Sequence, residues 1–311
     1  MSRCYRVYGL SLKSAIPLPC PAYVGSVPAV TELETASASV FTRACERAGV
    51  TVDDTQWFKY APLPDGSAYL RWSGLFEFLI SASGCRIACR PLNGASAEAF
   101  QTYLVSQVLS FALLKQGIES LHATTVAVNG LAAAFLGDSC YGKSSLGAAC
   151  LQAGHRLLTD DVLVVTEKHG RFVAHPGPPR IKLFPHIAQA FLGKLAAGTP
   201  MNPQTPKLVI PLPARLHTDR AVPLGTLYVL QPPGGSRRRR ITITPLSPRR
   251  ACLALVANTF NTVIMERTRL TRQFNLAARL AAAVPVKLLS YPDDPARLPA
   301  VVEAIRADLA L

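Results

Sequence analysis

The first hundred residues combine short alternating apolar stretches with frequent prolines. Residues 5–12 alternate loosely between apolar and polar side chains, and residues 75–80 and 84–89 are two apolar runs joined by a short turn. Alternation of this kind is typical of half-buried β-strands. We therefore predict a strand-rich N-terminal module over residues 1–95.

A longer apolar pattern with helical spacing follows, from Ser96 to Gly117. Serine is favoured at the N-cap of a helix and glycine just after its last turn, so both ends fit a helix. We predict that this helix opens a second, α/β domain over residues 96–311. Its later elements are predicted to be helices near 247–260, 266–283 and 296–309, and a strand at 285–289.

A β-hairpin is predicted near the start of this second domain. Apolar runs at 121–128 and 131–136 flank Asn129-Gly130, which is a strong signal for a two-residue hairpin turn. Residues 137–144 then read Gly-Asp-Ser-Cys-Tyr-Gly-Lys-Ser, which matches the phosphate-binding pattern G-x-x-x-x-G-K-[ST]. Residues 145–153 can continue as a helix, which completes the strand–loop–helix context that the pattern requires.

The residue types of this loop suit a nucleoside triphosphate. Gly137 and Gly142 let successive backbone N–H groups point at phosphates from a helix N-terminus. Lys143 adds a cation for the terminal phosphates, and Ser144 supplies a hydroxyl for Mg²⁺. A chance match in a glycine-bearing turn is the alternative, and the flanking elements argue against it. We predict ATP and Mg²⁺ binding by Gly137, Asp138, Ser139, Cys140, Tyr141, Gly142, Lys143, Ser144 and Ser145.

A pair of aspartates follows the loop helix. Residues 157–165 are predicted to form a buried strand with Asp160 and Asp161 in its middle. One carboxylate beside such a loop commonly holds Mg²⁺, and a second can accept the proton of an attacking hydroxyl. Neighbouring strand residues face opposite sides, so the two need not share one task, and either one could instead end the strand in solvent. We expect Asp160, Asp161 and Lys143 to be catalytic, and Ser144 and Asp161 to contact the metal.

The basic residues are concentrated in the second half of the chain. Lys and Arg outnumber Asp and Glu by 33 to 19 overall, and by 22 to nine over residues 151–311. Such a field attracts anions, which suits ATP and an acidic or phosphorylated partner. The run Arg237–Arg240 is predicted to be a solvated loop, and few aromatic residues accompany the basic ones, so we do not expect nucleic-acid binding. Three arginines of a late helix are predicted to lie on a solvated face or to reach a phosphate: Arg267, Arg269 and Arg272.

The cysteines and the apolar runs bear on the compartment. The eight cysteines include no C-x-x-C pair and no histidine partner at zinc spacing. A chain of 311 residues does not need disulfide bonds for its stability, so we expect free thiols in a reducing compartment. The first residues lack the apolar core of a signal peptide, and no uncharged run reaches the ~18 residues needed to span a bilayer. We expect a cytoplasmic protein without a membrane partner, and the sequence leaves open a homo-oligomer.

Three motifs, taken in order, resemble the catalytic half of the HPr kinase/phosphorylase superfamily. They are Leu121-His122, the loop 137–144, and Gly154-His-Arg-Leu-Leu-Thr-Asp-Asp161. The resemblance implies an α/β fold with a mixed central sheet and a P-loop core like that of phosphoenolpyruvate carboxykinases. It also implies phosphate transfer from ATP to a serine hydroxyl, with one aspartate of the pair as general base and the other at Mg²⁺. His122, which by spacing alone would more often be a structural residue, becomes a catalytic candidate.

The region after the aspartates departs from that superfamily. Residues 176–183 read Pro-Gly-Pro-Pro-Arg-Ile-Lys-Leu in place of a Glu-x-Arg-Gly-Leu-Gly type signature, and only Arg180 corresponds. Together with residues 5–10 and Leu18-Pro19, this segment is similar to HPr kinase-like proteins found with lasso-peptide and other ribosomal-peptide biosynthesis genes. The implied acceptor is a serine of a peptide or small protein, in lasso systems the C-terminal serine of the precursor.

Two further basic residues are candidates for contacting nucleotide or acceptor, Arg180 and Lys207. Two other functions remain open at this point. One is a nucleotide-binding regulator or ATPase without a transfer step, and the other is a small-molecule kinase.

Overall fold

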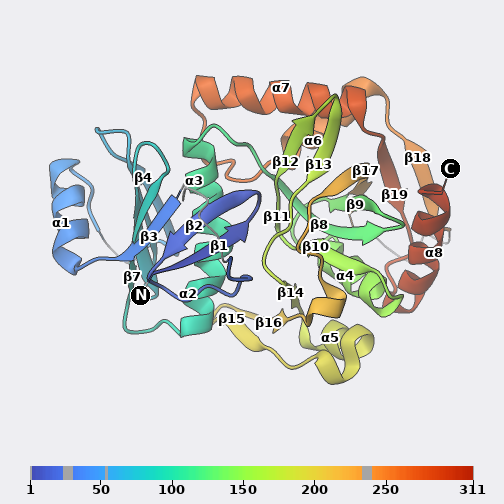
Figure 1. Ribbon diagram of the computed structural model, residues 1–311, viewed down its shortest axis with the longest axis horizontal. Helices are drawn as coiled ribbons and strands as arrows, with labels where there is room; N and C mark the ends of the chain where they lie inside the picture. Colours follow the sequence, from blue (N-terminus) through green and yellow to red (C-terminus); the bar gives the residue numbers. More distant parts are fainter. Residues whose placement is uncertain (1, 24–30, 53–54, 233–239, 311) are drawn as a thin grey trace. The chain divides into compact units, whose positions relative to one another are not determined.

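The computed structural model describes residues 2–23, 31–52, 55–232 and 240–310. It divides into two compact units, Met1–Ile118 and Glu119–Leu311. Both units combine helices with mixed β-sheets, which confirms the predicted α/β class (Figure 1). Within the described part of the chain, no helix is both long enough and apolar enough to cross a membrane.

The described strands of the first unit form one seven-stranded mixed sheet. The predicted pair at 75–80 and 84–89 is confirmed as antiparallel neighbours, β6 and β7. In spatial order the strands are β1 (Arg3–Val7), β2 (Leu10–Ser14), β3 (Thr31–Thr35), β7 (Arg86–Pro91), β6 (Phe76–Ile80), β5 (Ala68–Trp72) and β4 (Phe58–Pro62).

Helices cover both faces of this sheet. Tyr69 of β5 packs with Phe41 of α1 (Ala38–Arg47) in one buried cluster. On the opposite face, the ring of Trp72 lies 5.0 Å from the ring of Tyr103, centroid to centroid. Tyr103 ends α2 (Ala97–Tyr103), which continues through a π-helical turn, η1 (Leu104–Val108), into α3 (Leu109–Lys115).

The unit boundary differs from the sequence-based one. The helix starting at residue 97 was predicted to open the second domain, yet it belongs to the first unit, which ends at Ile118. The reason is aromatic packing between distant positions, since Phe100 stacks on Phe78 and the tilted ring of Tyr103 packs against Phe76. Helical periodicity shows that a face is apolar, but it does not show which sheet buries it.

The second unit is built on a larger mixed sheet. Among the described residues it has nine strands, and its centre is the row β8, β9, β17 and β19, in which β9, β17 and β19 are parallel. The strands are β8 (Leu121–Val128), β9 (Leu131–Leu136), β10 (Arg156–Thr159), β11 (Val162–Leu163), β12 (Val165–Lys168), β13 (Arg171–Ala174), β17 (Val222–Leu230), β18 (Thr242–Pro245) and β19 (Val286–Ser290).

Strand β9 shows how the sheet is buried on both faces. Ala133 and Phe135 join the core formed with α4 (Lys143–Gln152), α5 (Pro185–Leu192) and α8 (Leu298–Asp308). Ala132 and Ala134 join the opposite core, formed with α6 (Pro248–Ala257) and α7 (Arg267–Ala283). Because successive strand residues face opposite sides, a wholly apolar strand is what two covered faces require. The predicted C-terminal helices and strand are confirmed as α6, α7, β19 and α8.

A second, three-stranded sheet lies in the same unit. Its order is β14 (Arg180–Leu183), β16 (Thr205–Pro211) and β15 (Thr199–Asn202). The remaining short helical turns are η2 (Gly193–Leu195), η3 (Ala214–Leu216) and η4 (Pro295–Arg297). Of the predicted basic loop Arg237–Arg240, residues 237–239 lie outside the described residues.

The predicted hairpin is confirmed, and the predicted aspartate strand is not continuous. Strands β8 and β9 pair antiparallel around Asn129 and Gly130, which both have positive φ, as a type I′ turn requires. Strand β10 ends at Thr159, and Asp160 and Asp161 form a bend before β11. The Thr159 hydroxyl closes the bend by donating to the Val162 carbonyl at 2.8 Å. The two aspartates therefore do not sit on opposite faces of one strand.

Candidate functional site

The loop at residues 137–142 connects β9 to the N-terminus of α4. Gly142, the residue before the helix, has a φ of 89°, a left-handed conformation that side chains disfavour. A Cβ at this position would also lie 2.9 Å from the Tyr291 hydroxyl. Position 142 therefore requires glycine both for its backbone conformation and for the space next to Tyr291. The loop places the first N–H groups of α4 where they can bind an anion.

Lys143 is folded back onto its own loop. Its Nζ donates to the carbonyl oxygens of Gly137 at 2.5 Å and Asp138 at 2.9 Å. Burial lowers the pKa of Lys143 to about 8, against the opposing attraction of Asp160. The ammonium is thus held at the mouth of the loop, where a phosphate oxygen can replace a carbonyl as its partner.

Asp160 is buried behind the loop and accepts hydrogen bonds from three donors. Its Oδ1 accepts from the hydroxyls of Thr124 at 2.7 Å and Ser144 at 2.9 Å, and its Oδ2 accepts from the backbone N–H of Lys182 at 2.9 Å. These donors come from β8, α4 and β14, so the carboxylate joins three elements. A hydrogen-bonded carboxylate and P-loop hydroxyl form the oxygen pair that Mg²⁺ favours in P-loop proteins.

Asp161 has a different environment. It has a φ of 78°, and its carboxylate forms an ion pair with the ammonium of Lys182. Its side chain is 21% exposed and lines the cavity in front of the loop. The bend thus separates the two aspartates into one buried carboxylate attached to Ser144 and one carboxylate facing the cavity.

Lys182 is a site residue that sequence reasoning missed. It lies on β14, its side chain is only 6% exposed, and burial lowers its pKa to about 8. The available signal was a lysine between Ile181 and Leu183 in a short apolar strand, because a buried lysine needs a partner.

Three lysines converge on the cavity. Lys143 comes from α4, Lys182 from β14 and Lys207 from β16, and all three line it. The Lys207 ammonium lies 5.2 Å from the centre of the Phe184 ring, as in a cation–π contact. Lys207, predicted from sequence as a contact for nucleotide or acceptor, is thus at the site. Arg180 is buried at the start of β14 and is absent from the described residues that line the cavity.

His122 lines the same cavity as a neutral group. Its ring packs edge-on against Phe260 with centroids 5.3 Å apart. Burial and the nearby ammonium groups of Lys143 and Lys182 lower the pKa of His122 to about 3. Near neutral pH this imidazole can donate one hydrogen bond and accept another, but it carries no positive charge to attract a phosphate.

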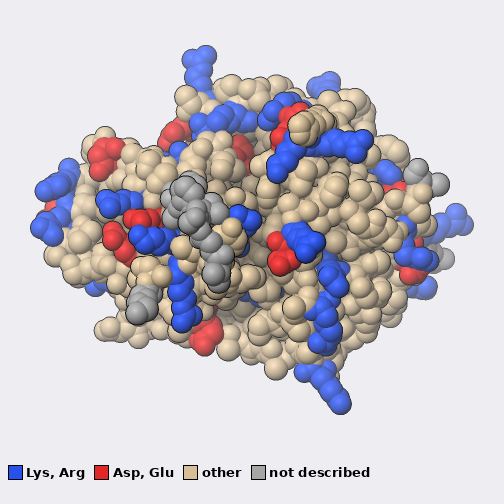
Figure 2. Space-filling view, in the orientation of Figure 1, with Lys and Arg blue, Asp and Glu red and all other residues tan. Residues whose placement is uncertain are grey.

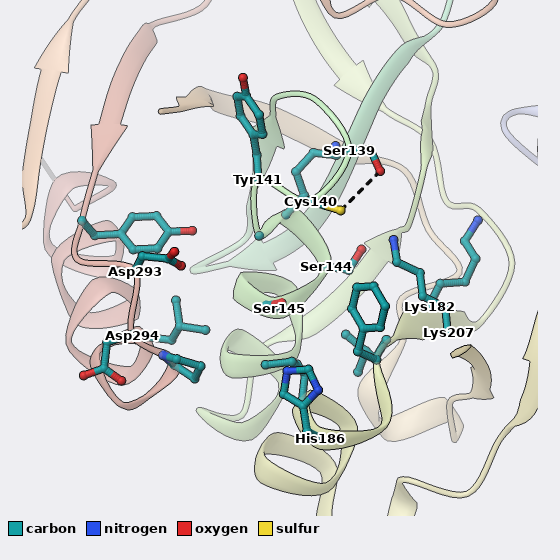
Figure 3. Close-up of a pocket in the computed structure, with 18 of the residues that line it drawn as sticks. Ser139, Cys140, Tyr141, Ser144, Ser145, Lys182, His186, Lys207, Asp293 and Asp294 are labelled. Carbon is teal, nitrogen blue, oxygen red and sulfur yellow. Dashed lines mark hydrogen bonds between the residues drawn. The ribbon is translucent and has the colours of Figure 1, made fainter. Parts of the chain in front are cut away.

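The cavity extends to both sides of the loop and has a volume of about 340 Å³ (Figure 3). Lys182 and Lys207 lie on one side of Ser144, and Asp293 and Asp294 lie on the other. Of the nine predicted loop residues, Ser139 to Ser145 line it, and Gly137 and Asp138 contribute carbonyls to Lys143. The other lining residues are His122, Asp161, Leu183, Phe184, His186, Ile187, Gln231, Tyr291, Pro295 and Leu298.

The predicted late-helix arginines lie elsewhere. Arg269 is 2% exposed, pairs with Glu119 at 3.3 Å and donates to the carbonyls of Ile264 and Phe260. It therefore neither lies on a solvated face nor lines the cavity, and both sequence-based interpretations of Arg269 were wrong. Arg267 is exposed, as predicted for a solvated face.

Comparison with known proteins adds little to this geometry. No protein-family model matches the chain, and no curated protein matches it. Among solved structures, the chain is similar to the Hpr(Ser) kinase/phosphatase from Coxiella burnetii. The two are 14% identical in sequence, the match covers 62% of this chain and 99% of the other, and the TM-score is 0.35. A TM-score of this size carries no argument about activity, so the function rests on the residues of the cavity.

Proposed function

We propose that this chain is an ATP- and Mg²⁺-dependent kinase that phosphorylates a serine hydroxyl of a peptide or small protein. The observation that carries the proposal is the pairing of Ser144 with Asp160 behind a phosphate-binding loop, while Asp161 faces the cavity. Such a site has a place for the donor phosphates and a separate carboxylate for the acceptor. A regulator that only binds nucleotide would have no need of the second carboxylate, whereas an ATPase would use it to activate water.

The residues present fit Mg²⁺. The Ser144 hydroxyl and the Asp160 carboxylate, 2.9 Å apart, supply the oxygen ligands that this ion prefers. This geometry favours Asp160 over Asp161 as the carboxylate at the metal, in contrast to the assignment made from sequence. When bound, Mg²⁺ would neutralise charge on the β- and γ-phosphates.

Asp161 is then the general base of the proposed reaction. Its carboxylate accepts the proton of the acceptor serine as the serine oxygen bonds to the γ-phosphorus, while the bond from that phosphorus to the β–γ bridging oxygen breaks and ADP leaves. Lys182 holds Asp161 in the cavity through their ion pair. Lys143, Lys182 and the loop N–H groups can offset the negative charge on the transferred group.

The charge of the chain supports an anionic acceptor. Its formal net charge is +14, and Lys and Arg side chains are spread over the face seen in Figure 2, with Asp and Glu among them. A positive field of this kind raises the encounter rate with acidic peptides. As the finer proposal, the acceptor is the C-terminal serine of a lasso-peptide precursor, whose own carboxylate suits Lys207.

Label transfer distinguishes the three functions considered. The purified chain is incubated with Mg²⁺, γ-labelled ATP and serine-containing acidic peptides, with and without a metabolite extract. We expect the label on a peptide serine. Label found only in free phosphate would support an ATPase or regulator, and label found in a soluble metabolite would support a small-molecule kinase. Either of these results would contradict the proposed acceptor.

A further inference from the structure

The carboxyl ends of three neighbouring parallel strands meet at one edge of the second unit's sheet. Strand β9 pairs parallel with β17, and β17 pairs parallel with β19. Their ends are in step, because Leu136 is opposite Val229 and Leu230 is opposite Leu289. Ligands of α/β proteins bind at this edge of a parallel sheet.

Each of these strands is followed by residues that line the cavity. Strand β9 leads into the phosphate loop, β17 into Gln231, and β19 into Tyr291 and Asp293. Tyr291 lies against the loop itself, since its hydroxyl is 2.9 Å from where a Cβ on Gly142 would be. The cavity therefore extends from the loop along the sheet edge, away from Asp160 and Asp161, which follow β10 on the other side of β8 and β9.

The two ends of the cavity differ in charge. Lys182, the ion-pair partner of Asp161, and Lys207 lie at one end. Asp293 and Asp294 lie at the opposite end (Figure 3). A nucleoside triphosphate carries its negative charge on its phosphates. The phosphate end is therefore attracted to the lysines and repelled by the carboxylates at the other end of the cavity. Its terminal phosphate must also reach the end where Asp161 lies, because the acceptor is activated there.

We propose that the end of the cavity formed by Gln231, Tyr291, Asp293 and Leu298 binds the nucleoside half of the nucleotide. This inference rests on the proposed function and adds a binding site to it. The ring of Tyr291 and the side chain of Leu298 supply apolar surface for a base, which stacks on aromatic side chains. The Asp293 carboxylate accepts hydrogen bonds from ribose hydroxyls or from an exocyclic amino group.

Asp293 is better suited to this task than its neighbour. Asp294 accepts a hydrogen bond from the N–H of Ala296 at 2.9 Å and caps the helical turn η4. Asp293 is exposed and lines the cavity, so its substitution removes a ligand contact without removing a cap. Tyr291 retains its hydroxyl proton in ordinary buffers, because burial raises its pKa to about 12.

The test compares ATP with inorganic tripolyphosphate, which lacks the nucleoside. Calorimetry in Mg²⁺ buffer measures both affinities for the wild type, Asp293→Asn and Tyr291→Leu, with the exposed Asp219→Asn as a matched control. We expect each site variant to weaken ATP binding about tenfold, the effect of one lost hydrogen bond or stacking contact, and not to weaken tripolyphosphate binding. The control should match the wild type for both ligands.

The other outcomes separate this inference from the proposed function. If both variants bind ATP as the wild type does, or lose ATP and tripolyphosphate equally, the nucleoside site is wrong and the kinase proposal stands. If the wild type binds neither ligand, the proposed function itself fails. Since Asp293→Asn changes an exposed side chain, its result holds even if Tyr291→Leu does not fold.

Discussion

The hydroxyl of Ser144 lies 2.9 Å from Oδ1 of Asp160, across 16 positions of sequence. The contact joins the first turn of α4 to the bend after β10, and Thr124 of β8 shares the same carboxylate oxygen. A single buried carboxylate thus connects the phosphate loop to the strands that carry the rest of the site. Under the proposed function, folding and catalysis depend on the same side chain.

Asp160→Ala should destabilise the second unit more than Ser144→Ala. Removing the carboxylate leaves the Thr124 hydroxyl and the Lys182 N–H without their acceptor in a buried region, whereas Ser144→Ala removes one donor. Each buried unsatisfied group costs about 1–3 kcal/mol. Chemical denaturation measures the difference, and equal stabilities of the two variants would contradict the described hydrogen bonds.

Lys182→Met should reduce phosphate transfer about a hundredfold or more, the typical cost of removing one charge stabiliser from an active site. The substitution also leaves Asp161 without its ion-pair partner. Lys182→Arg keeps the charge and should recover part of the loss. Lys194→Met, at an exposed lysine of η2, is the control and should behave as the wild type. Full activity of Lys182→Met would show that Lys182 has no role in phosphate transfer.

His122→Gln should alter the pH dependence of stability. The folded pKa of about 3 lies below the ordinary value of 6.5, so the unfolded state binds a proton first as the pH falls. The contribution of neutral His122 to the free energy of unfolding is therefore present above pH 6.5. It is lost as the pH falls below 6.5, by up to about 1.4 kcal/mol per pH unit. Denaturation at pH 7.5 and pH 5 should show a smaller loss for the variant than for the wild type. Equal losses would indicate an exposed His122.

Arg269→Ala should cost about 3–5 kcal/mol of stability, because it leaves the buried Glu119 carboxylate with only the longer contact to Arg272, at 3.8 Å, whose side chain is half-exposed. Burial already raises the pKa of Glu119, which shows how costly its charge is. The exposed Arg267→Ala on the same helix should change stability by less than about 0.5 kcal/mol. Thermal unfolding of both variants tests this, and similar melting temperatures would contradict the buried ion pair.

Local sequence signals correctly predicted the hairpin and the strand–loop–helix structure that follows it. Asn129-Gly130 and the glycines of the loop require particular backbone angles, and such requirements are visible in the sequence. The bend at Asp160-Asp161 was missed because it depends on β10 and β11 both pairing with β8. Lys182 was missed because a buried lysine is understood only when its partner is known. The unit boundary depends on contacts between Phe100 and Phe78, which no local pattern contains.

The rate of phosphoserine formation by Asp161→Asn is the most direct test of the central claim, that this cavity transfers phosphate to a serine with Asp161 as base. Single-turnover experiments measure the rate at which the phosphorylated peptide forms, and a separate titration measures the affinity for ATP. Together they separate the chemical step from nucleotide binding. We predict that Asp161→Asn lowers the transfer rate about 10²–10⁴-fold, the usual contribution of a general base, with ATP affinity little changed. Wild-type transfer by Asp161→Asn would contradict the account.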